Sequence, residues 1–201
     1  MAGTLEFYFD YGSPYSYLAD TQVGAIASRS GAALVRKPML LGGVFKATGN
    51  HSPAELPAKS KWSSFDMPLW ARHYGVPFQR NPFFPVNTLA LMRGAIAAHS
   101  LGVFERYVEE MYRHMWIDHK KMDDPAVYIA ALKESGFDAD KILETAGLPA
   151  VKAELIANTE RAVARGAFGS PTFFVGDEMW FGKDRLRDVE EAIAAKPAVA
   201  G

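Results

Sequence analysis

Apolar positions form short unbroken runs near both ends of the chain and recur at helical spacing in its middle. Residues 5–9 form one such run, which predicts a buried strand, and residues 32–41, "AALVRKPMLL", predict a second strand that ends at Gly42-Gly43. Between them, residues 14 to about 30 are expected to form a helix closed by Gly31. The chain is therefore predicted to open with a β-α-β unit.

The middle of the chain divides into two parts of different character. Residues 44–85 are rich in Pro, Asn and Ser, which predicts an ordered but irregular segment with a short helical piece around residues 67–74. Helical spacing then follows, with helix-start signals such as Asp124-Pro125 and helix-stop signals such as Gly136. It predicts a mostly helical subdomain, with helices near 87–99, 102–116, 125–135, 138–146 and 150–165.

Strand signals return near the end of the chain. The stretch "TFFVGDEMWF" has two short apolar runs around Gly176-Asp177, which predicts a hairpin. Leu186, Val189 and Ile193 then recur at helical spacing in a last helix, which is expected to start near residues 182–184. The predicted order is β-α-β, a helical insertion, then β-β-α.

Composition narrows the classes of protein. A chain of 201 residues with 49% hydrophobic content can bury one substantial core, so we expect a single globular unit. A net charge of −1 and the absence of a dense Lys/Arg run argue against a nucleic-acid partner. There is no stretch of roughly 18 apolar residues for a membrane span and no basic-then-apolar leader. We therefore expect a soluble, cytoplasmic protein without a membrane partner.

The residues that are missing or badly spaced exclude several chemistries. The sequence contains no cysteine, which excludes disulfides, zinc-thiolate sites and a cysteine nucleophile. His114 and His119 are five positions apart and do not share a helix face, so we expect no metal site. The G-x-S-x-G elbow of many hydrolases is also absent. Any sulfur chemistry must use a thiol brought from outside.

The first strand is followed by Gly12-Ser13-Pro14, where the first helix begins. Ser13 can cap the helix and Pro14 suits its first position. A helix start also presents free N–H groups and the positive end of the helix dipole, which favour an anion or a thiolate. Ser13 is therefore a cap, a catalyst or both.

Five motifs along the chain carry a resemblance to a known family. "FYFDYGSPYSYLA", "GNHSPAELPAK", "FPVNTL", "GSPTFFV" and "WFGKDRL" together resemble the 2-hydroxychromene-2-carboxylate isomerases and the kappa-class glutathione transferases, within the disulfide-bond oxidoreductase superfamily. The resemblance extends from residue 5 to about residue 195. It implies an α/β thioredoxin-like fold in which residues 1–43 and 157–201 form the thioredoxin-like domain and residues 44–156 form a large helical insertion.

The resemblance also implies a glutathione site around Ser13. In the oxidoreductases a Cys-x-x-Cys pair occupies the position of "SPYS", whose serines Ser13 and Ser16 exclude redox chemistry here. The glutathione thiol is expected against Ser13, which would stabilise the thiolate. Pro171 resembles the cis-proline that faces the helix start, and the backbone of Ser170 is expected to pair with the cysteinyl main chain.

The same resemblance implies which residues bind the two ends of glutathione. Lys59 is expected to bind the glycyl carboxylate and Asn50 a main-chain amide, although Lys59 also fits a solvated surface charge. Lys183 and Asp184, at the start of the last helix, are expected to hold the γ-glutamyl group, and a plain helix cap is the alternative for Asp184. Many family members have a small polar residue at the position of Lys183, so only its backbone is expected to contribute.

A second substrate needs an apolar pocket that accepts an aromatic ring. Tyr11 and Trp62 are candidates for its walls, although most aromatic side chains belong to the core. Asn87 either caps the following helix or reaches a substrate carboxylate.

The resemblance implies a glutathione-dependent cis-trans isomerase that converts 2-hydroxychromene-2-carboxylate-type hemiketals to trans-hydroxybenzylidenepyruvate-type products in aromatic degradation, and a homodimer. One alternative is a kappa-like glutathione transferase that conjugates electrophiles. The other is a non-catalytic thioredoxin-like binding module that has lost its cysteines.

Overall fold

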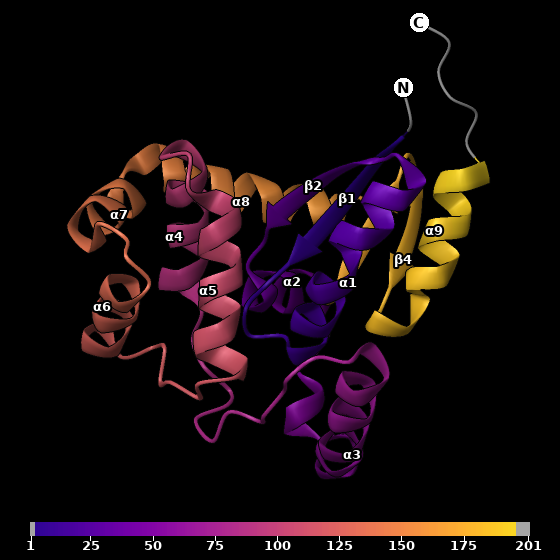
Figure 1. Ribbon diagram of the computed structural model, residues 1–201, viewed down its shortest axis with the longest axis horizontal. Coiled ribbons are helices and arrows are strands. Elements are labelled where there is room, and N and C mark those ends of the chain that lie inside the picture. The colour runs from indigo at the N-terminus through magenta and orange to yellow at the C-terminus, as the bar shows by residue number, and fades with distance from the viewer. Residues whose placement is uncertain (1–2, 196–201) are drawn as a thin grey trace, which may run out of the picture.

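The computed structural model describes residues 3–195 and contains a four-stranded sheet of order β2-β1-β3-β4 (Figure 1). β1 pairs in parallel with β2, with Phe7 opposite Arg36, and antiparallel with β3, with Phe7 opposite Phe173. The two ends of the chain therefore share one sheet, and the predicted thioredoxin-like α/β fold is confirmed. The strands are β1 (Thr4–Phe9), β2 (Ala33–Pro38), β3 (Thr172–Val175) and β4 (Glu178–Phe181).

Both faces of the sheet are covered, because successive side chains of a strand point to opposite sides. Leu5, Phe7 and Phe9 of β1 are fully buried in a core that includes α1 (Pro14–Ser30) and α9 (Leu186–Ala195). Tyr8 lies in a second core with Phe174, α2 (Leu41–Thr48) and the end of α8 (Pro149–Ala164). The sheet is thus the middle layer between two layers of helices.

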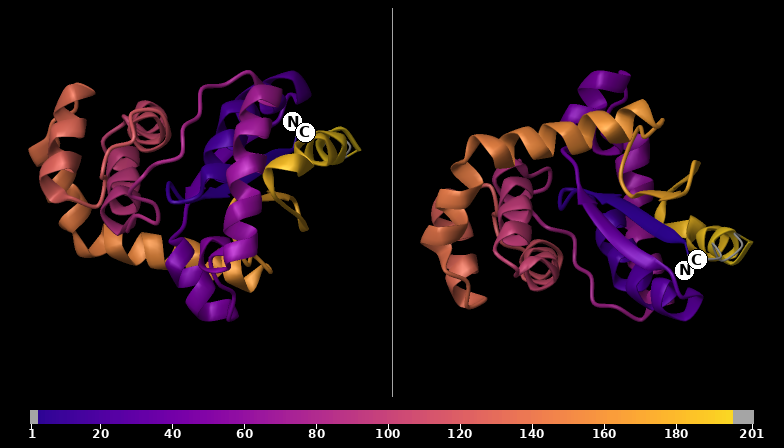
Figure 2. Two further views of the ribbon diagram at one scale, coloured as in Figure 1. Left: turned by 90° about the horizontal axis from the view of Figure 1, so that it is seen from below. Right: turned by 90° about the horizontal axis from the view of Figure 1, so that it is seen from above.

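A helical lobe lies beside the sheet and consists of α4, α5, α6, α7 and the first half of α8 (Figure 1). Figure 2 shows α8 running from this lobe along the sheet, and the boundary predicted at residues 156–157 falls inside it. The five predicted helices are confirmed to within a few residues. No helix within residues 3–195 has the length and apolar content needed to cross a membrane. The other lobe helices are α4 (Leu89–Ser100), α5 (Phe104–Trp116), α6 (Pro125–Glu134) and α7 (Ala139–Gly147).

Two expectations for residues 32–85 were wrong. The second strand ends at Pro38 and not at Gly42-Gly43, because α2 already begins at Leu41. The segment expected to be irregular contains α3 (Pro57–Tyr74), an 18-residue helix that packs against α1, and the short turn η1 (Pro53–Glu55). Pro68 lies inside α3, and an interior proline normally argues against a helix, which explains why the sequence predicted only its last turns.

A buried histidine joins α5 to the end of α6. The side chain of His114 is fully buried, with Nδ1 3.0 Å from Asp118 Oδ2 and Nε2 2.8 Å from Ser135 Oγ. Ser135 in turn donates to Glu110 Oε2 over 2.7 Å. Burial, together with the positive charges of Lys120 and Arg113, lowers the pKa of His114. We call these residues the His114 network.

Gly94 in α4 gives a test of core packing. A methyl group at this position would overlap the hydroxyls of Tyr107 and Tyr128, which are hydrogen-bonded to each other at 2.6 Å. Gly94→Ala is therefore expected to lower the free energy of unfolding by about 1–3 kcal/mol. The matched control is Gly24→Ala in α1, where nothing lies within 4 Å of the added carbon and helix propensity should raise stability by about 0.5–1 kcal/mol. Urea denaturation measures both, and two changes of the same sign would contradict this packing.

The His114 network predicts a dependence of stability on pH. Because the folded-state pKa of His114 lies below its ordinary value of about 6.5, the unfolded chain takes up a proton first as the pH falls. The contribution of neutral His114 to the free energy of unfolding is therefore complete above a pH of about 6.5 and is lost as the pH falls from there toward the folded-state pKa. The difference in unfolding free energy between the wild type and His114→Gln should be larger at pH 7.5 than at pH 5.5, as measured by urea denaturation. A difference that stays constant or grows toward low pH would contradict the assignment.

Candidate functional site

Ser13 lies where β1 passes into α1 and is 5% exposed. Its Oγ accepts a hydrogen bond from the N–H of Ser16 at 3.2 Å, so the predicted N-cap is confirmed. The same hydroxyl donates to the carbonyl of Ser170 over 2.8 Å. Ser13 therefore caps α1 and also joins the two halves of the sheet domain.

Ser170 and Pro171 directly precede β3 and face the start of α1. The peptide bond between them is cis, as the resemblance implies. Ser170 Oγ lies 2.5 Å from Ser16 Oγ, so both serines of the "SPYS" motif contact Ser170. The structure thus brings together Ser13, Ser16, Ser170 and Pro171 from opposite ends of the chain.

Asp10 holds the turn that carries Ser13, and it was not predicted as a site residue. Its Oδ1 accepts from the N–H of Gly12 at 2.8 Å and from the hydroxyl of Thr88 at 2.7 Å, while Oδ2 accepts from the N–H of Leu41 at 2.8 Å. Burial raises the pKa of this carboxyl although all three hydrogen bonds oppose the shift. The signal that could have identified it is a charged residue that follows an apolar strand shortly before a Gly-Ser-Pro turn.

Asn50 follows α2, and Lys59 lies near the start of α3. Asn50 Nδ2 donates to the carbonyl of Phe168 over 2.8 Å, which fixes the segment that leads into Ser170. Lys59 is exposed in the first turn of α3. Asn50 is thus tied to the Ser170 segment, whereas Lys59 points into solvent.

Lys183 and Asp184 begin η2 (Lys183–Arg185), the short turn before α9. The Lys183 side chain turns inward, and its Nζ lies 2.8 Å from Asp66 Oδ2 on α3. The hydroxyl of Tyr74 donates to the carbonyl of Lys183. Burial, with a smaller contribution from exposed Asp184, raises the pKa of Tyr74 to about 12. Lys183 was expected to contribute only its backbone, and its buried ion pair was not predicted.

The three candidates for a second substrate have different surroundings. Tyr11 is fully buried, its ring centroid 4.8 Å from that of Tyr112, so it belongs to the core and not to an open surface. Trp62 lies on α3, is 56% exposed and has its ring 5.6 Å from Lys183 Nζ. Asn87 Oδ1 accepts from the N–H of Leu89 at 3.0 Å, but the N-cap position of α4 is Thr88, so Asn87 is not the cap itself.

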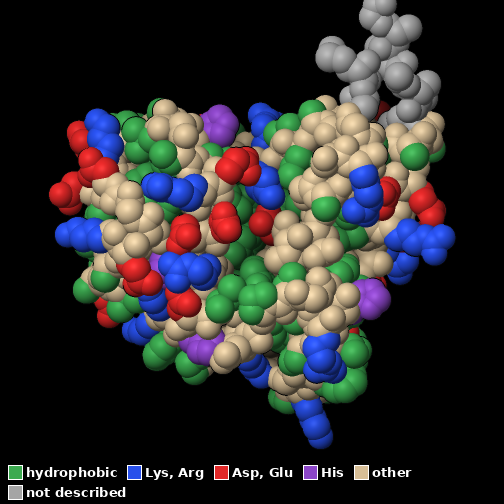
Figure 3. Space-filling model, viewed as in Figure 1, with side chains coloured by type: hydrophobic (Ala, Val, Ile, Leu, Met, Phe, Trp, Pro, Cys, Tyr) green, Lys and Arg blue, Asp and Glu red, His purple; other side chains and the backbone are tan. Residues whose placement is uncertain are grey.

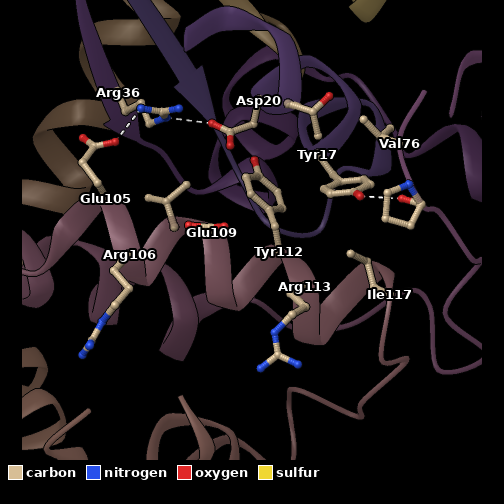
Figure 4. A pocket seen from close by; sticks show the side chains of 13 residues that line it. Tyr17, Asp20, Arg36, Val76, Glu105, Arg106, Glu109, Tyr112, Arg113 and Ile117 are labelled. Atoms are coloured by element: carbon tan, nitrogen blue, oxygen red, sulfur yellow. Dashed lines mark hydrogen bonds and ion pairs between the residues drawn. The ribbon is translucent and has the colours of Figure 1, made fainter. Parts of the chain in front are cut away.

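A cleft of about 540 Å³ separates α1 from α5, and Figure 3 shows the hollow on this face of the molecule. Arg36 lies between two carboxylates there, with Nε donating to Asp20 Oδ1 over 2.7 Å and Nη1 to Glu105 Oε2 over 2.5 Å (Figure 4). Tyr17, one turn after Ser13, contributes to the wall, but Ser13 does not. The cleft therefore lies beside the Ser13 site, and none of its residues was predicted as a site residue.

Within residues 3–195, one group of side chains has metal-ligand character: atoms of His114, Asp118 and Glu134 lie within 4.8 Å of one another. Its carboxylates already have cationic partners, since Arg113 pairs with Asp118 and Lys120 with Glu134, each at 2.5 Å. These contacts explain the cluster without an ion. The absence of a metal stays a prediction.

Two curated proteins are similar to this chain over nearly its whole length. The 2-hydroxychromene-2-carboxylate isomerase of Sphingobium xenophagum is 31% identical over 197 residues, which cover 94% of this chain and 97% of the relative. Glutathione S-transferase kappa 1 of Homo sapiens is 27% identical over 211 residues, which cover 96% and 92%.

Solved structures and a family model give the same relationship. The structure of a 2-hydroxychromene-2-carboxylate isomerase matches with a TM-score of 0.84 at 28% identity and covers 94% of both chains. DsbA of Pseudomonas aeruginosa shares the fold, with a TM-score of 0.59 at 19% identity over 95% of this chain and 82% of DsbA. The family model of the DSBA-like thioredoxin domain matches residues 4–194. The chain therefore belongs to the DSBA-like thioredoxin domain family and is similar in sequence and structure to its 2-hydroxychromene-2-carboxylate isomerases.

Proposed function

We propose that the protein is a glutathione-dependent cis-trans isomerase that acts on a 2-hydroxychromene-2-carboxylate-type hemiketal. The observation that carries the proposal is the buried Ser13 hydroxyl at the start of α1, in hydrogen-bond contact with Ser170, in a chain without cysteine. Relatives named as isomerases and as kappa-class transferases support an enzyme of this group.

The start of α1 suits a thiolate. A free thiol has a pKa of about 8.5 and is mostly protonated at neutral pH, so it needs donors that favour the anion. Tyr15, in the first turn, has an N–H that no preceding helical carbonyl can accept, and Pro14 has none to offer. The single hydrogen of the Ser13 hydroxyl would turn from the Ser170 carbonyl to the sulfur. Ser13 thus acts as a donor to the thiolate and not as the nucleophile.

The neighbouring residues suit the rest of the tripeptide. The Ser170 backbone, just before β3, pairs with the cysteinyl main chain as an added strand would. The backbone of Lys183 and the carboxylate of Asp184 hold the γ-glutamyl group. Lys59 reaches the glycyl carboxylate, and Asn50 holds the segment that leads into Ser170. When bound, glutathione supplies a thiolate that adds to a conjugated carbon of the ring-opened substrate, which allows bond rotation before the thiolate leaves.

A kappa-like glutathione transferase is the second candidate, favoured by the 27% identity to human glutathione S-transferase kappa 1. The two reactions differ in what happens to glutathione. Isomerisation leaves the concentration of free glutathione constant through many turnovers, whereas conjugation depletes it in proportion to product. Both candidates require glutathione binding, which calorimetric titration with reduced glutathione tests, with proton release measured. No binding at millimolar glutathione to the folded protein would favour the non-catalytic binding module.

Ser13→Ala tests the role of the hydroxyl. Loss of this donor should raise the pKa of the bound thiol and lower the turnover rate at neutral pH by about 10- to 100-fold, because a thiolate loses its charge-assisted hydrogen bond. Absorbance of the bound thiolate as a function of pH measures that pKa. The matched control is Asp138→Ala, which removes the N-cap of α7 in the helical lobe and should cost stability without moving the thiol pKa. An unchanged thiol pKa in Ser13→Ala would show that Ser13 is only a helix cap.

A further inference from the structure

The ion pair between Lys183 and Asp66 is the most deeply buried opposite-charge contact beside the Ser13 site. Lys183 is 8% and Asp66 5% exposed, with 2.8 Å between Nζ and Oδ2. Three aromatic rings surround the ammonium, with centroids 4.6 Å away for Tyr15, 5.0 Å for Trp70 and 5.6 Å for Trp62. Such rings attract a cation through their negative faces. We call these five residues the Lys183 cage.

The cage joins the two parts of the chain that the proposed glutathione site needs. Tyr15 belongs to the first turn of α1, two positions after Ser13, and Lys183 opens the turn that carries Asp184. Asp66, Trp62 and Trp70 all come from α3. Tyr74, at the end of α3, donates a hydrogen bond to the Lys183 carbonyl and so also holds η2 in place. The cage therefore lies between the start of α1 and the start of η2.

The net charge of the cage affects how strongly an anionic ligand can bind beside it. Glutathione has two carboxylates and one ammonium near neutral pH, and its thiolate form has a further negative charge. In a poorly solvated site, a carboxylate without a partner repels such a ligand much more strongly than it would in water. The influence of Asp66 on its surroundings is visible at Tyr15, whose pKa is raised by burial and then by the charge of Asp66. Lys183 compensates this charge.

We propose that Lys183 is a positioning residue of the glutathione site, where its ammonium neutralises Asp66 so that an anionic tripeptide can bind beside the cage, at the starts of α1 and η2. This inference rests on the proposed function. It assigns to the Lys183 side chain a role that is separate from the backbone contact of the same residue. It also assigns a role to Asp66, whose charge acts on the ligand at a distance and without direct contact.

Three variants separate charge from packing. Lys183→Met leaves Asp66 unpaired and should weaken the binding of reduced glutathione by about tenfold or more, a change of about 1.4 kcal/mol per factor of ten. Asp66→Asn leaves the ammonium unpaired and should keep or tighten binding. The double variant Asp66→Asn/Lys183→Met has no charge in the cage and should return to within about threefold of the wild type. Lys141→Met, at an exposed position of α7, is the control for net charge and should change binding less than about twofold.

Isothermal calorimetry of the full chain with reduced glutathione gives these dissociation constants, and enzyme kinetics give a second measure. The KM for glutathione should follow the same order, and the changes in KM should be larger than the changes in kcat at saturating glutathione. A purely structural clamp would make both single variants weaker, and the double variant no better, which would overturn the inference. Asp66→Asn preserves the shape of the side chain, so its sign decides the question even if Lys183→Met does not fold.

Failure of the proposed function gives a different result. If the wild type binds no glutathione, the proposed function is wrong and the inference falls with it. If the wild type binds glutathione but the affinities of the three variants do not follow the expected order, only the inference is wrong.

Discussion

The structure depends on the pairing of β1 with strands from both ends of the chain. β1 lies in parallel with β2, which follows it closely, and antiparallel with β3, which follows only after the whole helical lobe. This long-range pairing places Ser170 beside Ser13, and their hydrogen bond then fixes the start of α1 against the β3 segment. In the chain the lobe lies between β2 and β3, the two strands that flank β1 in the sheet.

The site forms at a point where local structure already favours it. Ser13 would cap α1 in any fold, and Asp10 would shape the turn before it through the N–H of Gly12. Tertiary structure adds the distant partners: the Ser170 carbonyl for Ser13, and the Thr88 hydroxyl and the N–H of Leu41 for Asp10. Both residues therefore have local and distant partners, so the geometry of the site depends on the complete fold.

Local signals explain what could be predicted from the sequence. The end of α1 at Gly31 and the hairpin at Gly176 rest on residues whose backbone takes a positive φ, and both were predicted correctly. Contacts between distant segments were not predictable in this way. Lys183 resembles a surface lysine until α3 brings Asp66 to it, and α3 itself was hidden by Pro68. Aromatic residues gave no local sign of their burial, so Tyr11 and Trp62 looked alike although one is in the core and the other is exposed.

Helix α8 has a mechanical consequence for the molecule. Its 16 residues extend for about 24 Å as one stiff rod, with α4 and α7 packed against it as well as α2 and β2. Directly after it, Arg165 is fastened to the sheet by its ion pair with Glu6 and by its position 3.7 Å from the centroid of the Phe174 ring. Helix α8 therefore braces the helical lobe against the sheet, and the segment that leads to Ser170 starts from its anchored end.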